Sequence, residues 1–271
     1  MTLGLVCGLF GLIAGSFLNV VILRHGAKSL DGRSQCMSCG VQLKWYDLVP
    51  VISWVALRGK CRACHSSISI QYPLVELASG VSFVLIGTSQ ETFGLVTPFY
   101  FAVAAFMIVI AAYDIRHTII PDEWAYMFAI LAAVTSIMAP LYAGSFLFLI
   151  LAGPLAALPL FLLWLVSGGS WMGLGDAKLA LGIGWLLGPV YGPAAIMGAF
   201  VIGAVISVGI LLPLPHARAY LHRLRAGKGI ARLRGGHTGL TMTSEVAFGP
   251  FLVASAFLTW MLLLYHVPLP L

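Results

Sequence analysis

The sequence predicts an all-α polytopic membrane protein, with about eight transmembrane helices and a small polar cytoplasmic loop domain. Three observations predict this class. Of the 271 residues, 60% are hydrophobic and only 9% are charged, against roughly a quarter charged in a typical soluble domain. The chain holds repeated apolar runs long enough to approach or cross a hydrocarbon core of about 30 Å. Its cations are confined to a few segments.

The apolar runs give eight candidate spans. They cover residues 3–23, 74–88, 97–113, 124–141, 145–166, 177–190, 194–213 and 247–265. Spans two and six are short, which is compatible with a partly re-entrant segment or one deep in the bundle. No Lys or Arg precedes or interrupts the first run, so it lacks the basic start of a signal peptide. We interpret it as an uncleaved span that begins outside.

The positions of the 15 Lys and Arg residues predict the orientation. They follow span one, follow span three, open span six, or lie between spans seven and eight. With eight spans, all of these positions fall on one side of the membrane, which the positive-inside rule identifies as the cytoplasm. This placement explains the net charge of +6 without a nucleic-acid partner, and we expect none.

The chain therefore divides into three parts. Residues 1–23 form the first helix, residues 24–72 a polar cytoplasmic loop domain, and residues 73–271 the rest of the bundle. The bundle carries a basic cytoplasmic loop, 214–243, which we interpret as attracted to anionic lipid. No internal repeat is visible in the sequence, which weakens a transporter built from duplicated halves.

Four cysteines occur as two pairs in the loop domain. Cys36 and Cys39 form one C-x2-C pair, and Cys61 and Cys64 form the other. Paired thiolates at this spacing are typical of a zinc ribbon, in which they bind one tetrahedral ion. A loop too small for a strong core gains stability from a metal. A redox pair remains an alternative, and disulfides are disfavoured in the cytoplasm. Such a closed site leaves no position for catalysis.

Two of the nine acidic residues lie at a depth that is costly for a charge. Asp114 ends the apolar run of span three, and Asp176 opens span six within Gly-Leu-Gly-Asp. Both reach the same side of the membrane at the same depth, where an ionisable residue indicates function. The alternative is a helix N-cap at Asp176 and a border aspartate at Asp114. Two carboxyls that share a poorly solvated site favour one proton between them, as in aspartic proteolysis. Helix-end charges favour Asp176 as base and Asp114 as acid.

The other acids have structural interpretations. Asp31 and Asp47 lie in the loop domain, where we expect them to be solvated. Glu76 follows Pro73 at the start of span two, where it complements a helix N-terminus. Asp122 follows a proline and immediately precedes span four, which is the N-cap position.

The ordered motifs resemble the type IV prepilin peptidases, and the resemblance covers nearly the whole chain. The motifs are Gly15-Ser-Phe-Leu-Asn19, the two C-x2-C pairs, Gln71-Tyr-Pro-Leu-Val-Glu76, Ile120-Pro-Asp122, Gly173-Leu-Gly-Asp176-Ala-Lys178 and Phe248-Gly-Pro250. Met37 stands where the family usually has proline, and Val246-Ala247 replaces a frequent Ile-Pro. Neither departure touches the aspartates.

The resemblance implies a bifunctional enzyme of the bacterial inner membrane. Such enzymes cut the basic leader peptide from type IV prepilins and type II secretion pseudopilins at the cytoplasmic face. They then N-methylate the new N-terminal residue with S-adenosylmethionine. The resemblance maps the catalytic aspartates onto Asp114 and Asp176 and associates residues 24–72 with methylation. No Gly-rich phosphate loop is visible, so no residue is assigned to binding the methyl donor.

Two other classes of function compete with this interpretation. A transporter would use Asp114 and Asp176 as proton or cation sites, but the loop domain would have no role in it. A membrane assembly factor would use the loop domain and the bundle only to bind a partner. Proteolysis of a prepilin-like peptide distinguishes the three.

Overall fold

The computed structural model describes residues 2–26, 32–90, 93–141, 145–211 and 247–267, and their regular secondary structure is almost entirely helical. The long helices are α1 (Thr2–Arg24), α3 (Gln71–Ser89), α4 (Thr97–His117), α5 (Asp122–Met138), α6 (Phe146–Ser167), α7 (Leu174–Ile206) and α9 (Gly249–Leu264). Two short elements, η1 (Trp45–Leu48) and α2 (Ile52–Ala56), lie in the loop domain, and a π-helical turn, η2 (Ser207–Leu211), follows α7. No β-strand longer than an isolated bridge occurs in the described ranges. The basic loop 214–243 and Asp31 lie outside them.

The predicted fold class is confirmed. Five helices are long and apolar enough to cross a membrane: α1, α3, α4, α6, and α7 with its extension to Gly209. At 17 and 16 residues, α5 and α9 are shorter. The eight predicted spans correspond to seven long helices among the residues described, because α7 contains two of the spans. Spans six and seven are the parts of α7 before and after a kink, which we call its two arms.

A sharp reversal separates these two arms. Gly188 has φ 86° and ψ 179°, a conformation essentially restricted to glycine, and Pro189 follows it. A Cβ on Gly192 would lie 3.0 Å from the Cα of Gly184, whereas eight residues of continuous helix would rise about 12 Å. The chain therefore folds back on itself after residue 187.

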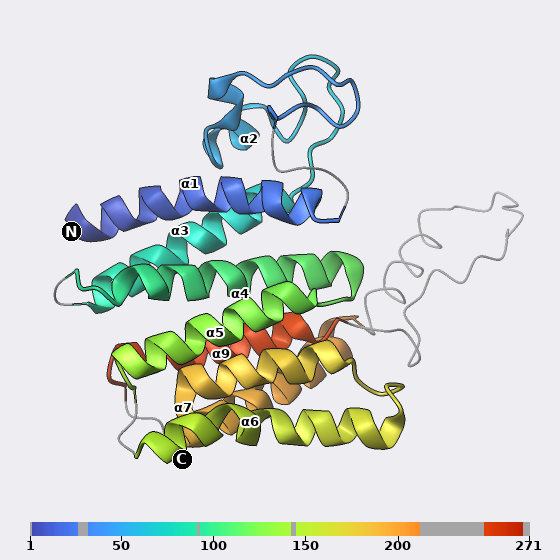
Figure 1. Cartoon of the computed structure of the whole chain (residues 1–271). Coiled ribbons are helices and arrows are strands. Elements are labelled where there is room, and N and C mark those ends of the chain that lie inside the picture. Colours follow the sequence, from blue (N-terminus) through green and yellow to red (C-terminus); the bar gives the residue numbers. More distant parts are fainter. Residues whose placement is uncertain (1, 27–31, 91–92, 142–144, 212–246, 268–271) are drawn as a thin grey trace, which may run out of the picture.

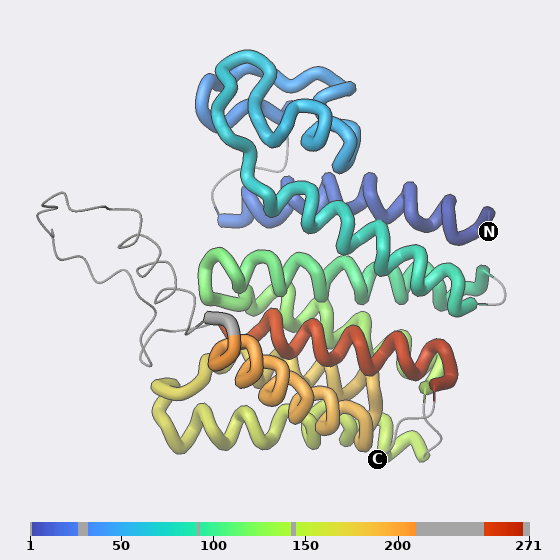
Figure 2. Tube along the Cα trace, turned by 180° about the vertical axis from the view of Figure 1, so that it is seen from behind, coloured from blue at the N-terminus to red at the C-terminus, as the bar shows by residue number. Residues whose placement is uncertain are grey.

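The helices form a bundle whose axes run roughly side by side (Figures 1 and 2). Small residues allow close packing: a Cβ on Gly15 of α1 would lie 2.7 Å from the Cα of Glu76 of α3. The end of α4 and the starts of α5, α7 and α9 gather at one end of the bundle, on the right in Figure 1 and on the left in Figure 2. Asp114 and Asp176 lie at this end.

Candidate active site and cysteine cluster

Asp114 is buried near the C-terminal end of α4. Only 4% of it is exposed, and its Oδ2 accepts a hydrogen bond of 3.0 Å from the backbone N–H of Gly249. The helix ends just beyond, where Thr118 adopts the left-handed conformation and donates its N–H to the Asp114 carbonyl oxygen at 2.7 Å. The start of α9 therefore contacts the Asp114 carboxyl, and the backbone carbonyl of Asp114 accepts the hydrogen bond that caps the end of α4.

Asp176 lies in the first turn of α7. The helix begins at Leu174, and Gly173 is its cap residue. Asp176 is therefore not the N-cap that the alternative interpretation required. It is 9% exposed, and a Cβ on Gly173 would lie 3.7 Å from its Oδ2. The glycine thus leaves room beside the carboxyl.

The fold brings these two aspartates, 62 positions apart in sequence, to the same site. Ile120, in the loop between α4 and α5, connects their surroundings: it faces both Gly175, which precedes Asp176, and Gly249, which contacts Asp114. Two buried carboxyls whose surroundings share one side chain are an arrangement that could perform acid–base catalysis on water.

Gly249 was missed as a contact of the site. The sequence indicated Phe248-Gly-Pro250 only as a family motif, and we find that Gly249 begins α9, with Phe248 as the cap residue. The first N–H groups of a helix have no partner within it. One of them is therefore available to Asp114.

The N-cap role predicted for Asp122 is wrong. The residue is the first of α5, Pro121 is the cap, and no side-chain capping bond is present there. Instead Asp122 Oδ1 lies 2.7 Å from Lys178 Nζ. The ammonium also lies 5.3 Å from the centre of the Tyr126 ring. This ion pair joins the starts of α5 and α7.

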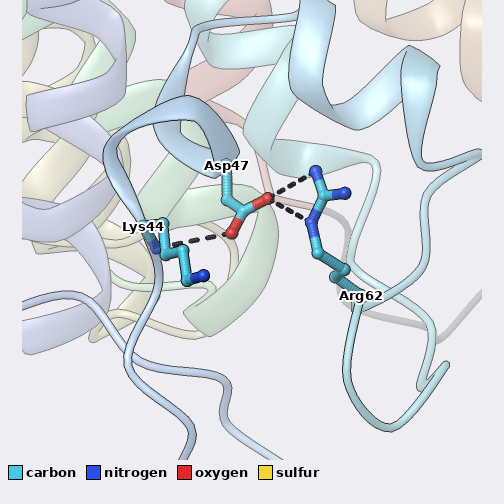
Figure 3. A network of polar contacts seen from close by, with 3 residues as sticks. All are labelled: Lys44, Asp47 and Arg62. Atoms are coloured by element: carbon cyan, nitrogen blue, oxygen red, sulfur yellow. Dashed lines mark hydrogen bonds and ion pairs between the residues drawn. The ribbon is translucent and has the colours of Figure 1, made fainter.

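Asp47 is not solvated, which corrects the sequence interpretation. Its side chain is 8% exposed, and its Oδ1 lies 2.8 Å from a guanidinium nitrogen of Arg62. Its Oδ2 accepts the N–H of Lys44 at 3.3 Å. Figure 3 shows how this carboxylate joins η1 to the loop that carries the second cysteine pair.

Glu76 connects the loop domain to the bundle. It is 6% exposed and accepts the N–H of Val51 at 2.7 Å. Val51 has φ 61°, which is rare for a β-branched residue. We predicted that Glu76 complements the start of its own helix, and the structure shows instead a contact with a residue of the loop domain.

The four cysteines of the loop domain converge. The sulfurs of Cys36, Cys39, Cys61 and Cys64 all lie within 4.8 Å of one another. Cys36 and Cys64 are 3.8 Å apart, close to the edge of about 3.8 Å that a tetrahedron with metal–sulfur bonds of about 2.3 Å would have. These donors therefore fit a tetrahedral metal ion.

The two cysteine pairs have the same local structure. Cys36 donates its N–H to Val41 and accepts from Gly40, while Cys61 donates to Ser66 and accepts from His65. Gly40 and His65 both have positive φ, at 70° and 56°.

Hydrogen bonds favour the thiolate form of two of the four cysteines, whereas desolvation and the neighbouring Cys64 and Cys36 side chains raise the pKa of Cys39 to about 11. Backbone N–H groups of Cys39 and Ser38 lower the pKa of Cys36 to about 6, and the Ser66 side chain lowers the pKa of Cys64. Thiolates are the metal-binding form of cysteine. Cys7, buried in α1, is not part of the cluster.

The fold and the site define a multi-pass helical membrane protein with paired buried aspartates at one end and a four-cysteine cluster. Two family models match the chain: Bacterial Peptidase A24 N-terminal domain over residues 9–89, and Type IV leader peptidase family over residues 101–208. The chain belongs to the type IV leader peptidase family, and it is an enzyme.

Relatives named prepilin leader peptidase/N-methyltransferase support this assignment. The protein of Bacillus subtilis is 31% identical over 84% of this chain and 92% of its own length. That of Pectobacterium carotovorum is 30% identical over 74% and 81%. A Myxococcus xanthus protein is 40% identical, but the match covers 41% of this chain and 33% of that protein. No solved structure gives a significant match.

Proposed function

We propose that the protein is an aspartic endopeptidase of the bacterial inner membrane that removes the leader peptide from type IV prepilins or type II secretion pseudopilins. The observation that carries the proposal is the convergence of Asp114 and Asp176, each at least nine-tenths buried, at one end of the bundle. Membership in a leader peptidase family supplies the substrate class.

The proposed mechanism uses one proton shared by the two carboxyls. Like charges in a poorly hydrated site do not readily ionise together, so one carboxylate removes a proton from water while the other carboxyl protonates the scissile carbonyl. The N–H of Gly249 holds Oδ2 of Asp114 in place. Asp176 as base and Asp114 as acid in the resting enzyme stays a prediction, because a coupled pair titrates jointly.

We further propose that the site faces the cytoplasm. The described cations Arg24, Arg116 and Lys178 belong to the helix ends that gather with the aspartates, as the positive-inside rule requires of a cytoplasmic end. A basic leader would then approach from the cytoplasm. Asp47 and Glu76 are engaged in contacts within the protein, so we assign neither of them to recognising the leader.

The second proposed activity is N-methylation of the new N-terminal residue with S-adenosylmethionine as methyl donor. The names of the relatives include this activity. The cysteine cluster would hold a structural Zn²⁺ through four thiolates, which would stabilise a loop that is too small for a strong core. With four protein ligands the ion has no open position, so we assign it no part in either reaction.

A cleavage assay tests the proposal. Purified protein in detergent or lipid nanodiscs is given a peptide with a basic leader, a Gly-Phe junction and an apolar segment. We expect mass spectrometry to show cleavage after glycine, and a gain of one methyl group on the product when S-adenosylmethionine is present. Intact peptide in several detergents and lipids would contradict the proposed peptidase. Cleavage without methylation would contradict only the second activity.

A further inference from the structure

Ile120 is a buried residue in an otherwise exposed turn. The loop from Thr118 to Pro121 joins α4 to α5, and its first residue has φ 54°. Ile119 is 64% exposed, whereas Ile120 is only 7% exposed. The turn thus directs one of two consecutive isoleucines into the protein.

The buried side chain lies between two helix starts that carry glycine. A Cβ on Gly175 of α7 would lie 3.0 Å from Cβ of Ile120, and a Cβ on Gly249 of α9 would lie 3.2 Å from its Cδ1. Both distances are shorter than ordinary van der Waals contact between carbons, about 3.5–4.0 Å. Glycine at each position therefore lets both helices approach the isoleucine closely.

Both of these glycines are next to an aspartate. Gly175 immediately precedes Asp176, and Gly249 donates its N–H to Asp114 at 3.0 Å. A shift of α7 relative to Ile120 would therefore move the Asp176 carboxyl, and a shift of α9 would move the N–H that holds the Asp114 carboxyl.

An ion pair reinforces the same connection. Asp122, two residues after Ile120, lies 2.7 Å from Lys178, two residues after Asp176. Lys178 is largely buried, with 17% of its side chain exposed, while Asp122 is 65% exposed. Because the Asp122 end of this pair is open to water, its energy is reduced by screening, and we take the packing of Ile120 as the principal contact.

We propose that Ile120 is a positioning residue that sets the separation of the Asp114 and Asp176 carboxyls by packing between Gly175 and Gly249. The inference rests on the proposed peptidase function. Ile120 touches neither substrate nor the reacting atoms in this role. It acts through the two helix starts.

The kinetic test compares Ile120→Ala with Ile119→Ala, the matched control in the exposed neighbouring position. For Ile120→Ala we expect kcat to fall about 10- to 100-fold, because a displacement of about 1 Å has an effect of this size. KM should stay within about threefold. At least one limb of the pH–rate profile should move by about half a pH unit, since the coupling of the pair depends on its separation. Ile120→Val keeps the branched Cβ and should lose less than about fivefold.

A geometric test is independent of catalysis. Asp114→Cys and Asp176→Cys are combined, with and without Ile120→Ala, and the rate of disulfide formation between the two positions is measured by mass spectrometry of that cross-linked peptide. We expect Ile120→Ala to change the rate several-fold and Ile119→Ala to leave it unchanged.

The outcomes separate this inference from the proposed function. An unchanged cross-linking rate would overturn it even if the wild type failed to cleave peptide. If the wild type is active, a normal kcat and a normal pH profile per folded molecule of Ile120→Ala would also overturn the inference. If Ile120→Ala only lowers the folded fraction, while the kinetics per folded molecule and the cross-linking rate are unchanged, Ile120 only stabilises the fold and the inference is rejected.

Discussion

Asp114 and Asp176 reach one site by different local means. Asp114 lies in the last turn of α4, and the N–H that holds it comes from the start of another helix, at Gly249. Asp176 lies in the first turn of its own helix, next to Gly173. Each is buried at the end of a helix, where a mostly apolar environment meets polar backbone. This combination suits groups that exchange protons with one bound water.

The first prediction concerns these carboxyls. Asp114→Asn and Asp176→Asn each keep the side-chain shape and replace the ionisable carboxyl with an amide that cannot act as acid or base, so we expect cleavage to fall at least about 10³-fold in either variant, in line with losses of a member of a catalytic unit. Initial rates of peptide cleavage measure this.

Glu123→Gln is the matched control, because Glu123 is an exposed acid at the start of α5. It should retain activity within about twofold. Near-normal cleavage by either asparagine variant, with its melting temperature intact, would refute the roles assigned to the pair.

At the residue scale, sequence reasoning located the unusual acids and failed on the partners of the ordinary ones. The depth of these two acids can be predicted from the sequence, because Asp114 ends one apolar run and Asp176 begins another. The partners of Asp47, Glu76 and Asp122 lie 15, 25 and 56 positions away. A local rule such as N-capping cannot detect contacts made by tertiary packing.

At the scale of elements, the reversal in α7 shows what an apolar pattern can locate. The sequence placed a break between spans 177–190 and 194–213, and the chain turns at Gly188. It could not show that the arms pack so closely that Gly192 touches Gly184, because that contact depends on the backbone angle at one glycine.

The second prediction concerns this turn. Gly188→Ala places a Cβ on a residue with φ 86° and ψ 179°, and such strain costs about 1–3 kcal/mol. We expect the melting temperature in detergent to fall by several degrees and part of the purified protein to aggregate.

Gly94→Ala is the control for the same chemical change. A Cβ there meets nothing within 4 Å, and the backbone has no positive φ. Equal melting temperatures for both variants would contradict the reversal at Gly188.

The third prediction concerns the cysteine cluster. We expect purified protein to contain about one Zn²⁺ per chain by elemental mass spectrometry, and Cys61→Ser to lose it to a mild chelator, because a ligand of the tetrahedral site is removed. Cys7→Ser should retain the metal, since Cys7 is not part of the cluster.

Leader cleavage should survive in Cys61→Ser, because the closed cluster has no catalytic position. Equal metal content in Cys61→Ser and Cys7→Ser would remove the cluster as the binding site. The spacing of the cysteines predicted this convergence. It did not predict the ion pair between Asp47 and Arg62, a residue that lies in the sequence between the two cysteines of the second pair.

At the scale of the whole molecule, composition and charge predicted the class and a common side for the cations. They could not predict which helices pack together. That depends on side-chain fit, such as the approach of Gly15 to Glu76 between α1 and α3. The division of the chain at residues 23 and 72 stays a prediction. The contact between Glu76 and Val51 shows that the loop domain is joined to the bundle across the second boundary.

The last prediction tests the orientation of the bundle. The connection between α3 and α4 lies at the end of the bundle opposite the start of α7 (Figure 1) and carries Leu95, which is 86% exposed. The connection between α6 and α7 leads directly into the start of α7 and carries the exposed Ser170. If the end at the start of α7 is cytoplasmic, Leu95→Cys should react with a membrane-impermeant maleimide in intact spheroplasts. Ser170→Cys should react only after permeabilisation. The wild type provides the background, because the four cysteines of the cluster would face inside and Cys7 is buried. Reaction of Ser170→Cys in intact spheroplasts would place the aspartates outside, where a cytoplasmic leader could not reach them.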